Sequence, residues 1–210
     1  MTRTTPDFSF ETSAAAHGYL QIAGVDEVGR GPIAGPVVAA AVILNPDHIP
    51  AGLNDSKCLT ARKRDSLYDE IQRMAFVGIA QATVSEIEEH NILRASHLAM
   101  IRALAALPVC PDYALIDGNM LPRNLPCPAM ALVKGDARSQ SIAAASIMAK
   151  VWRDRLMVGL AQQHPGYGWD RNAGYPTPEH KEGLKCNGVT LHHRRAFAPI
   201  RNILWQEKNP

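Results

Sequence analysis

Two apolar segments near the start of the chain, separated by a Gly/Pro-rich turn, set the strongest limit on what this sequence can fold into. The first runs from Leu20 to Val25 and the second from Val37 to Leu44. Apolar runs of this length, bounded by turn residues, are typical of buried β-strands. Since glycines and prolines fill much of the intervening segment, the two strands are expected to pair as a hairpin.

The rest of the chain alternates between short apolar runs and segments with helical spacing. Further strands are predicted over residues 76–83, 113–116 and 129–133. Helices are predicted where a capping residue precedes apolar positions at helical spacing. They are expected to start at Thr60 (with Leu67, Ile71 and Met74 on one face), at a capping box over Ser85–Glu88 with continuation over 92–107, at Ser139 with an end near Gln162, and at Thr177 with a stop at Gly188.

This order of elements predicts one α/β domain, in which a mixed central sheet is flanked by helices. Residues 1–18 are rich in Thr and Ser and are expected to form a loose N-terminal tail. The domain itself is expected to span residues 19–210, which is long enough to bury a sizeable core without disulfide or metal support.

Composition places the chain among ordinary globular proteins, with 46% hydrophobic and 20% charged residues. The net charge of +2 permits a polyanionic partner without requiring one. Four scattered cysteines without a C-x-x-C pair indicate reduced thiols in a cytoplasmic protein, not a disulfide framework or a zinc site. The longest apolar stretch, Pro32–Leu44, is too short to span a membrane, and no secretory signal is visible.

Carboxylates follow three of the predicted strands. Asp26-Glu27 comes at the end of the first strand, Asp117 at the end of another, and Asp136 shortly after a third, each near a glycine. Strand ends can converge at one edge of a sheet, which is where open α/β sheets bind ligands. Clustered carboxylates repel one another unless a cation neutralises them, and all-oxygen ligands suit Mg²⁺ or Mn²⁺ better than zinc. The pattern therefore indicates a divalent-metal site.

Two observations keep other interpretations open. Asp117-Gly118 and Gly135-Asp136 are common turn dipeptides, so each acid alone fits a turn as well as a ligand. Adjacent residues on a regular strand point to opposite faces, so Asp26 and Glu27 cannot both reach one site from a regular strand. Either the following glycine twists the chain, or one of the two residues contributes its backbone carbonyl.

Seven segments of the sequence resemble the motifs of the ribonuclease HII family. In family order they are Gly24–Pro32, Leu53–Lys57, Ile116–Asn119, Val133–Asp136, Ala143–Asp154, Gly174–Thr177 and His192–Phe197. One such motif has little specificity, whereas seven in the same order over nearly the whole chain are very specific.

The resemblance implies an RNase H-like fold with a small helical C-terminal part. It implies that Asp26, Glu27, Asp117 and Asp136 surround two divalent ions, Mg²⁺ or Mn²⁺, which act together in catalysis. The implied reaction is endonucleolytic hydrolysis of the RNA strand in RNA–DNA hybrids and at ribonucleotides embedded in duplex DNA, giving 5′-phosphate and 3′-hydroxyl ends. The implied roles are ribonucleotide excision and RNA primer removal, carried out by a monomer.

Substrate contacts are also implied by the resemblance. The backbone of Gly29-Arg30-Gly31 is expected to contact the ribose 2′-hydroxyl, because glycines allow a close approach of the main chain to a ligand. Tyr175 is expected to stack on the deoxyribose beyond the RNA–DNA junction. Lys57 and Lys134 are expected to contact phosphates.

Three segments require separate interpretation. The family often has His-Lys where this chain has Asn172-Ala173, which puts in doubt a backbone contact of that lysine and makes Arg171 a candidate substitute. Arg153 is expected to form a helix-surface ion pair beside Asp154. Adjacent histidines seldom ligate one ion together, so His192-His193 is expected to have a structural or phosphate-proximal role.

Two rival functions fit part of the pattern. A hybrid-binding protein without turnover would keep the substrate groove, but the presence of all four acids disfavours it. A different metal nuclease on a similar fold, such as a junction resolvase, would need four-way DNA as its substrate. The Gly29-Arg30-Gly31 segment argues against this second rival.

Overall fold

A five-stranded mixed sheet forms the centre of the computed structural model, which describes residues 5–208. The strands are β1 (Ile22–Val28), β2 (Val37–Ile43), β3 (Phe76–Ala82), β4 (Tyr113–Asp117) and β5 (Ala129–Leu132). Their order across the sheet is β3-β2-β1-β4-β5. β2 is antiparallel to both β1 and β3, whereas β1, β4 and β5 run parallel. The hairpin and the mixed sheet predicted from the sequence are therefore confirmed.

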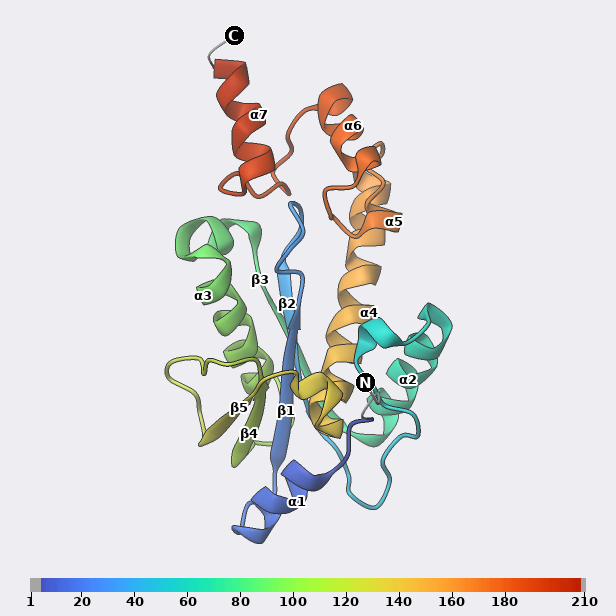
Figure 1. Ribbon diagram of the computed structural model, residues 1–210, viewed down its shortest axis with the longest axis vertical. Helices are drawn as coiled ribbons and strands as arrows, with labels where there is room; N and C mark the ends of the chain where they lie inside the picture. Colours follow the sequence, from blue (N-terminus) through green and yellow to red (C-terminus); the bar gives the residue numbers. More distant parts are fainter. Residues whose placement is uncertain (1–4, 209–210) are drawn as a thin grey trace.

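Helices cover both faces of this sheet (Figure 1). They are α1 (Ser9–Ala16), α2 (Ala61–Met74), α3 (Val84–Ala105), α4 (Gln140–Gln163), α5 (Trp169–Asn172), α6 (Pro178–Asn187) and α7 (Ala198–Lys208), with short 3₁₀ turns η1 (Ser56–Cys58) and η2 (Gly135–Ala137). α3 packs on one face, and α2 and α4 pack on the other, so each face has its own hydrophobic core. α5, α6 and α7 gather beyond one end of the sheet, as the predicted helical C-terminal part requires.

Capping residues start the helices largely where the sequence predicts. The side chains of Thr60, Ser139 and Thr177 each accept a hydrogen bond from a backbone N–H in the first turn of α2, α4 and α6. The capping box predicted over Ser85–Glu88 is two residues late, since Thr83 and Glu86 form the capping box of α3. Between β3 and α3, Thr83 comes before Ser85 and has Glu86 three positions later, which is the spacing that the motif needs.

The expectation of a loose tail over residues 1–18 is wrong for residues 9–16, which form α1. Residues 1–4 lie outside the described part of the chain. Glu11 on α1 is fully buried and accepts hydrogen bonds from the Ser139 hydroxyl (2.6 Å) and the Ser141 amide (2.9 Å). A carboxylate at a helix N-terminus is favourably placed, and this contact fixes α1 against the start of α4.

The backbones of β1 and α4 approach one another closely, with no side chain between them at Gly24. A Cβ atom on Gly24 in β1 would overlap the carbonyl carbon of Ser141 and the amide nitrogen of Ile142. Fully buried alanines at Ala143 and Ala144 continue this close packing along α4. Only glycine at position 24 therefore lets the helix lie this close to the strand that carries Asp26.

Among the helices of residues 5–208, none combines the length and the apolar character that crossing a membrane requires.

We predict that Gly24→Ala lowers the free energy of unfolding by about 3 kcal/mol or more, because the added methyl group meets backbone that cannot rotate away. Gly159→Ala is the matched control, since a Cβ on that α4 glycine meets nothing within 4 Å. The control is expected to stabilise the protein by about 0.5–1 kcal/mol through helix propensity. Urea denaturation of both variants measures these changes, and equal stability of the two would contradict the close packing.

Candidate metal centre

The carboxyl ends of three parallel strands bring the predicted acids to one edge of the sheet. Pairing of β1 with β4 ends at Val25 and Ile116, so Asp26 stands level with Asp117, the last residue of β4. Asp117 in turn pairs with Leu132, the last residue of β5. The chain then turns through η2, which carries Asp136. Parallel strand direction therefore places all these carboxylates at the same end of the sheet.

Three of the four predicted acids meet closely. One carboxylate oxygen from each of Asp26, Glu27 and Asp117 lies within 4.8 Å of the other two. The carboxylates of the two adjacent acids therefore both reach the cluster. Pairing of β1 with β4 ends at Val25, whereas pairing with β2 continues over Asp26 and Glu27, so this end of β1 has one free edge.

Asp136 lies beside this group of three. Its Oδ2 atom is 3.8 Å from Nζ of Lys57, whose side chain is 77% exposed. Burial, followed by the negative charges of Asp55 and Asp117, raises the pKa of Asp136 to about 6, although Lys57 opposes the rise. Asp136 is therefore electrostatically part of the cluster without belonging to its three closest ligands.

Arg30 and Lys57 offset only part of the cluster's negative charge. Burial raises the pKa of Asp26 well above its ordinary value, and the charges of Glu27, Asp117 and Asp136 raise it further. Burial also raises the pKa of Glu27, against the opposing effect of Arg30, whose Nη1 atom lies 3.2 Å from Oε1. The other oxygen of Glu27, Oε2, is buried and has no hydrogen-bond partner within the described chain. Hard oxygen donors, mutual repulsion and an unsatisfied oxygen all fit a divalent cation.

Hydrogen bonds hold the acids in place. The amide of Gly135 donates to Oδ1 of Asp117 (2.6 Å), and the amide of Glu27 donates to Oδ1 of Asp26 (2.7 Å). The first of these bonds ties the end of β4 to η2. The acids are therefore oriented by backbone groups before any ligand arrives.

Asp55 joins the site although the sequence did not single it out. Its Oδ1 accepts a hydrogen bond from the Lys57 amide (2.9 Å) and lies 3.9 Å from Lys57 Nζ. Asp55 thus caps η1 and aims Lys57 toward Asp136. The available signal was its place in Leu53–Lys57, where an acid two residues before a lysine can form such a turn. By contrast, Lys134 is exposed in a left-handed conformation (φ 56°) and is not brought against the acids.

Two buried arginines support the segment that follows Asp26-Glu27. Arg194 donates to the backbone carbonyls of Gly29 (2.6 Å), Arg30 (3.1 Å) and Gly35 (2.9 Å). Arg153 donates to those of Ala34 (3.1 Å), Pro36 (3.0 Å) and Ala173 (2.9 Å).

Both guanidiniums are almost fully buried, and burial lowers the pKa of Arg153 to about 10 and that of Arg194 to about 9. Both are therefore still charged at neutral pH. The prediction of a surface ion pair for Arg153 is wrong, since Asp154 pairs with Lys150 instead (2.7 Å). Arg153 shares a helix face with the buried Ala149 and Met157, four residues to either side, and this spacing was the signal for burial.

Tyr175 lies against the glycine-rich segment. A Cβ atom on Gly31 would be 3.3 Å from Cε1 of Tyr175, and the Tyr175 side chain is 45% exposed. Its amide donates to the carbonyl of Asn172 (2.9 Å), and its carbonyl is 2.8 Å from Nδ1 of His180. The structure therefore places Tyr175 against Gly31 in the segment that follows Asp26-Glu27.

Histidines and an asparagine shape the turn that carries Tyr175. Nε2 of His180 is 3.1 Å from Nε2 of the buried His193, and burial, followed by the charges of neighbouring histidines, lowers the pKa of His193 to about 3. His193 is thus a neutral structural residue. The buried Asn172 donates to Tyr167 and accepts from Gly174. Arg171 pairs with Asp170 and Glu179, so it is already engaged on the surface.

Comparison with known proteins gives a consistent result. The family model "Ribonuclease HII" matches residues 23–200. A ribonuclease HII of Ruegeria pomeroyi is 65% identical over 97% of this chain and 87% of its own length. The crystal structure of ribonuclease H2 from Pyrococcus horikoshii superposes with a TM-score of 0.78 at 28% identity, covering 91% of this chain and all of that one. The PCNA–RNase HII complex of Archaeoglobus fulgidus gives a TM-score of 0.69 at 26% identity, covering 85% and 95%.

We predict that Asp117→Asn stabilises the metal-free protein by about 1 kcal/mol, because it removes one of the repelling charges and keeps the oxygen that accepts from Gly135. The same variant is expected to lose most of the stabilisation that Mg²⁺ gives to the unsubstituted protein. Thermal melts in chelator and in Mg²⁺ measure both effects. Asp47→Asn, on an exposed turn after β2, is the control and is expected to change neither. The metal centre would be contradicted if Asp117→Asn melted at a lower temperature than the unsubstituted protein in chelator and Mg²⁺ stabilised both proteins equally.

Proposed function

The chain belongs to the ribonuclease HII family and is therefore an endoribonuclease that acts on RNA–DNA hybrids, and we propose that it works by two-metal catalysis. In this proposal it cuts the RNA strand of hybrids and the junction at ribonucleotides embedded in duplex DNA. The products carry 5′-phosphate and 3′-hydroxyl ends. Its roles in the cell are ribonucleotide excision and removal of RNA primers.

The acid cluster at the end of β1 carries this proposal. Asp26, Glu27 and Asp117 would hold divalent cations, Mg²⁺ or Mn²⁺, with Asp136 completing the set from η2. Two such cations, when bound, supply polarisation of the scissile phosphate and stabilisation of negative charge on the attacking and leaving oxygens. Acids that lie this close together and are partly buried destabilise a fold unless a ligand neutralises them.

Recognition of the 2′-hydroxyl is assigned to the backbone of Gly29-Arg30-Gly31. Arg194 already occupies the carbonyls of Gly29 and Arg30. The amide N–H groups of these three residues donate to no group in the described part of the chain, so they remain available to an incoming ribose oxygen. A Cβ atom on Gly29 would overlap Arg153, and Gly29 has φ +96°, so this segment is both rigid and restricted to glycine.

Tyr175 is assigned to the deoxyribose beyond the junction. Its ring is half-exposed beside Gly31, which is the geometry of a stacking surface and not of a core residue. Lys57 is assigned to a phosphate near the acids because its ammonium group is exposed and faces Asp136. Lys134 is assigned to a phosphate farther along the strand, and we place the protein in the cytoplasm as a monomer.

Membership of the family sets aside both rival functions, the hybrid-binding protein without turnover and the junction resolvase. The number of cations, the identity of the ion and the preference for single ribonucleotides belong to the proposal. Cleavage assays with defined duplexes test these finer points.

We predict cleavage of a duplex with one embedded ribonucleotide and of a long hybrid, with no cutting of pure DNA. Activity is expected to require Mg²⁺ or Mn²⁺, to disappear in excess chelator and to be poorly restored by Zn²⁺, since the ligands are all carboxylates. End analysis of the products checks the 5′-phosphate and 3′-hydroxyl. Full activity in chelator, or cutting of pure DNA at a similar rate, would sink the proposal.

We predict that Tyr175→Ala lowers kcat/KM at a single embedded ribonucleotide by roughly ten- to a hundredfold, the equivalent of about 1–3 kcal/mol of lost stacking. Stabilisation of the protein by Mg²⁺ is expected to be unchanged. Tyr68→Ala is the control, because that ring on α2 packs under the guanidinium of Arg155 on α4. Melting temperature and cleavage are measured on the same preparations. If Tyr175→Ala melts early but cuts normally when folded, Tyr175 is structural and its assigned role is wrong.

A further inference from the structure

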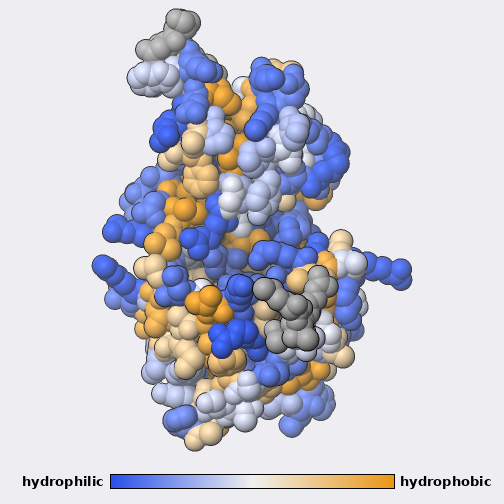
Figure 2. All heavy atoms as spheres, in the orientation of Figure 1, coloured by the Kyte–Doolittle hydropathy of each residue, from blue (hydrophilic) through white to orange (hydrophobic). Residues whose placement is uncertain are grey.

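An apolar groove of about 480 Å³ lies between α3 and the loop that follows β4. Leu93 and Ile101 on α3 line one side, and Met120 and Leu121 line the other. Met120 is 51% exposed and Leu121 is 41% exposed. Figure 2 shows hydrophobic side chains over α3 on this face, at the left of the view. Exposed apolar residues that gather in a hollow mark an interaction site more often than isolated ones do.

Two arginines give this groove a positive charge. Arg94 and Arg123 both line it, and neither guanidinium has a partner within residues 5–208. Arg102 on the same helix is different, since Glu86 neutralises it at 2.6 Å. Among the described residues that line the groove, none is Asp or Glu. The groove is therefore complementary to an anion with apolar surface, not to a neutral or cationic ligand.

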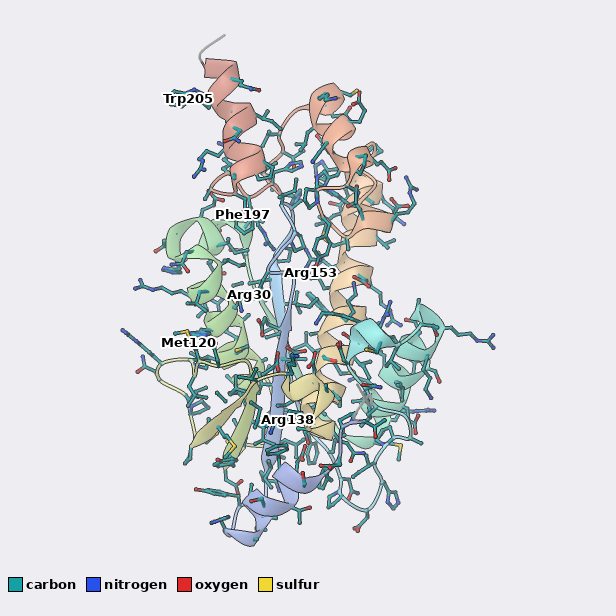
Figure 3. All side chains as sticks on the ribbon, in the orientation of Figure 1. Arg30, Met120, Arg138, Arg153, Phe197 and Trp205 are labelled. Atoms are coloured by element: carbon teal, nitrogen blue, oxygen red, sulfur yellow. The ribbon has the colours of Figure 1, made fainter. Side chains whose placement is uncertain are left out.

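The groove opens beside the candidate metal centre. Met120 follows Asp117 by three residues, so the loop that forms one side leads directly away from a predicted metal ligand. His97 lines the groove and lies close enough to Arg30 that, after burial, the Arg30 charge is what lowers the pKa of its imidazole. Figure 3 shows Arg30 and Met120 beside α3 on the same face of the molecule.

We propose that this groove is an extension of the substrate site, and that it holds the sugar–phosphate backbone of the duplex to one side of the cut. The proposal deepens the proposed function and rests on it. Phosphates would contact Arg94 and Arg123, and the C–H-rich edges of the sugars would pack on Leu93, Met120 and Leu121. Contacts of this kind position a duplex without reading its sequence.

Duplex backbone fits better than two other occupants. A single strand needs aromatic side chains on which its bases stack, and none of the described lining residues is Phe, Tyr or Trp. A protein helix would fit the apolar walls, but it would cover two guanidiniums and would have to supply acids to both. Continuity with Arg30 and Asp117 favours the ligand that the neighbouring site already takes.

The first experiment reverses the charges of the groove. Arg94→Glu and Arg123→Glu are compared with Arg73→Glu, which makes the same change near the start of β3, at the opposite end of the sheet from the acids. Binding is measured by fluorescence anisotropy on two duplexes. One is long and carries one central ribonucleotide, and the other is too short to reach the groove from the acid cluster. Each groove variant is expected to weaken long-duplex binding roughly tenfold and to reduce the log–log salt slope by about 0.9 per lost phosphate contact.

The second experiment is a gain of binding, which misfolding cannot produce. Met120→Lys adds a cation to the exposed side of the groove and is expected to tighten long-duplex binding several-fold. Met74→Lys, on the 37% exposed residue at the end of α2, is the matched control and is expected to leave binding unchanged.

Three results would overturn the proposal. The first is that Arg73→Glu weakens binding as much as the groove variants do. The second is that the groove variants weaken binding to the short and long duplexes equally, and the third is that they weaken binding only when the duplex carries a single-stranded overhang. Because anisotropy measures binding and not cutting, the groove is tested even if cleavage fails. Failure of the unsubstituted protein to cut either duplex would overturn the proposed function alone.

Discussion

Concentrated negative charge at the end of β1 is the constraint on which the rest of the structure depends. Asp26, Glu27 and Asp117 each bring one carboxylate oxygen within 4.8 Å of the other two, and Arg30 pairs with only one of them, Glu27. Such a group assembles only where the chain leaves little freedom to move apart. Parallel pairing of β1, β4 and β5 sets the common edge, and the Gly135 amide holds Asp117 against it. The same repulsion between carboxylates favours the binding of divalent cations at this edge.

Buried arginines hold the backbone of the glycine-rich segment that follows the acids. Arg153 and Arg194 are charged and nearly inaccessible, and backbone carbonyls satisfy their donors instead of carboxylates. A planar guanidinium with five donors suits this task, because it can bridge several carbonyls of an irregular loop at once. The carbonyls of Gly29 and Arg30 are thereby turned inward, which leaves the amides on the outer side.

Local signals in the sequence predicted most of the elements and most of the site. Thr60 and Thr177 predicted the starts of α2 and α6, because capping is a contact between residues close in the sequence. Strand ends indicated that Asp26 and Asp117 could converge, whereas the set of four acids with Asp136 came from the family resemblance. The prediction for Arg153 was wrong because its partners are backbone carbonyls distant in the sequence. Every residue has such a carbonyl, so a sequence pattern does not reveal which ones an arginine contacts. α1 was missed for a similar reason, since its anchor, Glu11, bonds to residues more than a hundred positions away.

The order in which a ribosome delivers these parts has its own consequence. Asp26, Glu27 and the glycine-rich segment emerge early, whereas Arg153, Tyr175 and Arg194 come from the last third of the chain. The carbonyls near Gly29 cannot be fixed until those residues arrive, even though the hairpin of β1 and β2 is already complete. A growing chain is therefore unable to hold the Gly29-Arg30-Gly31 segment in its final conformation until synthesis is nearly over.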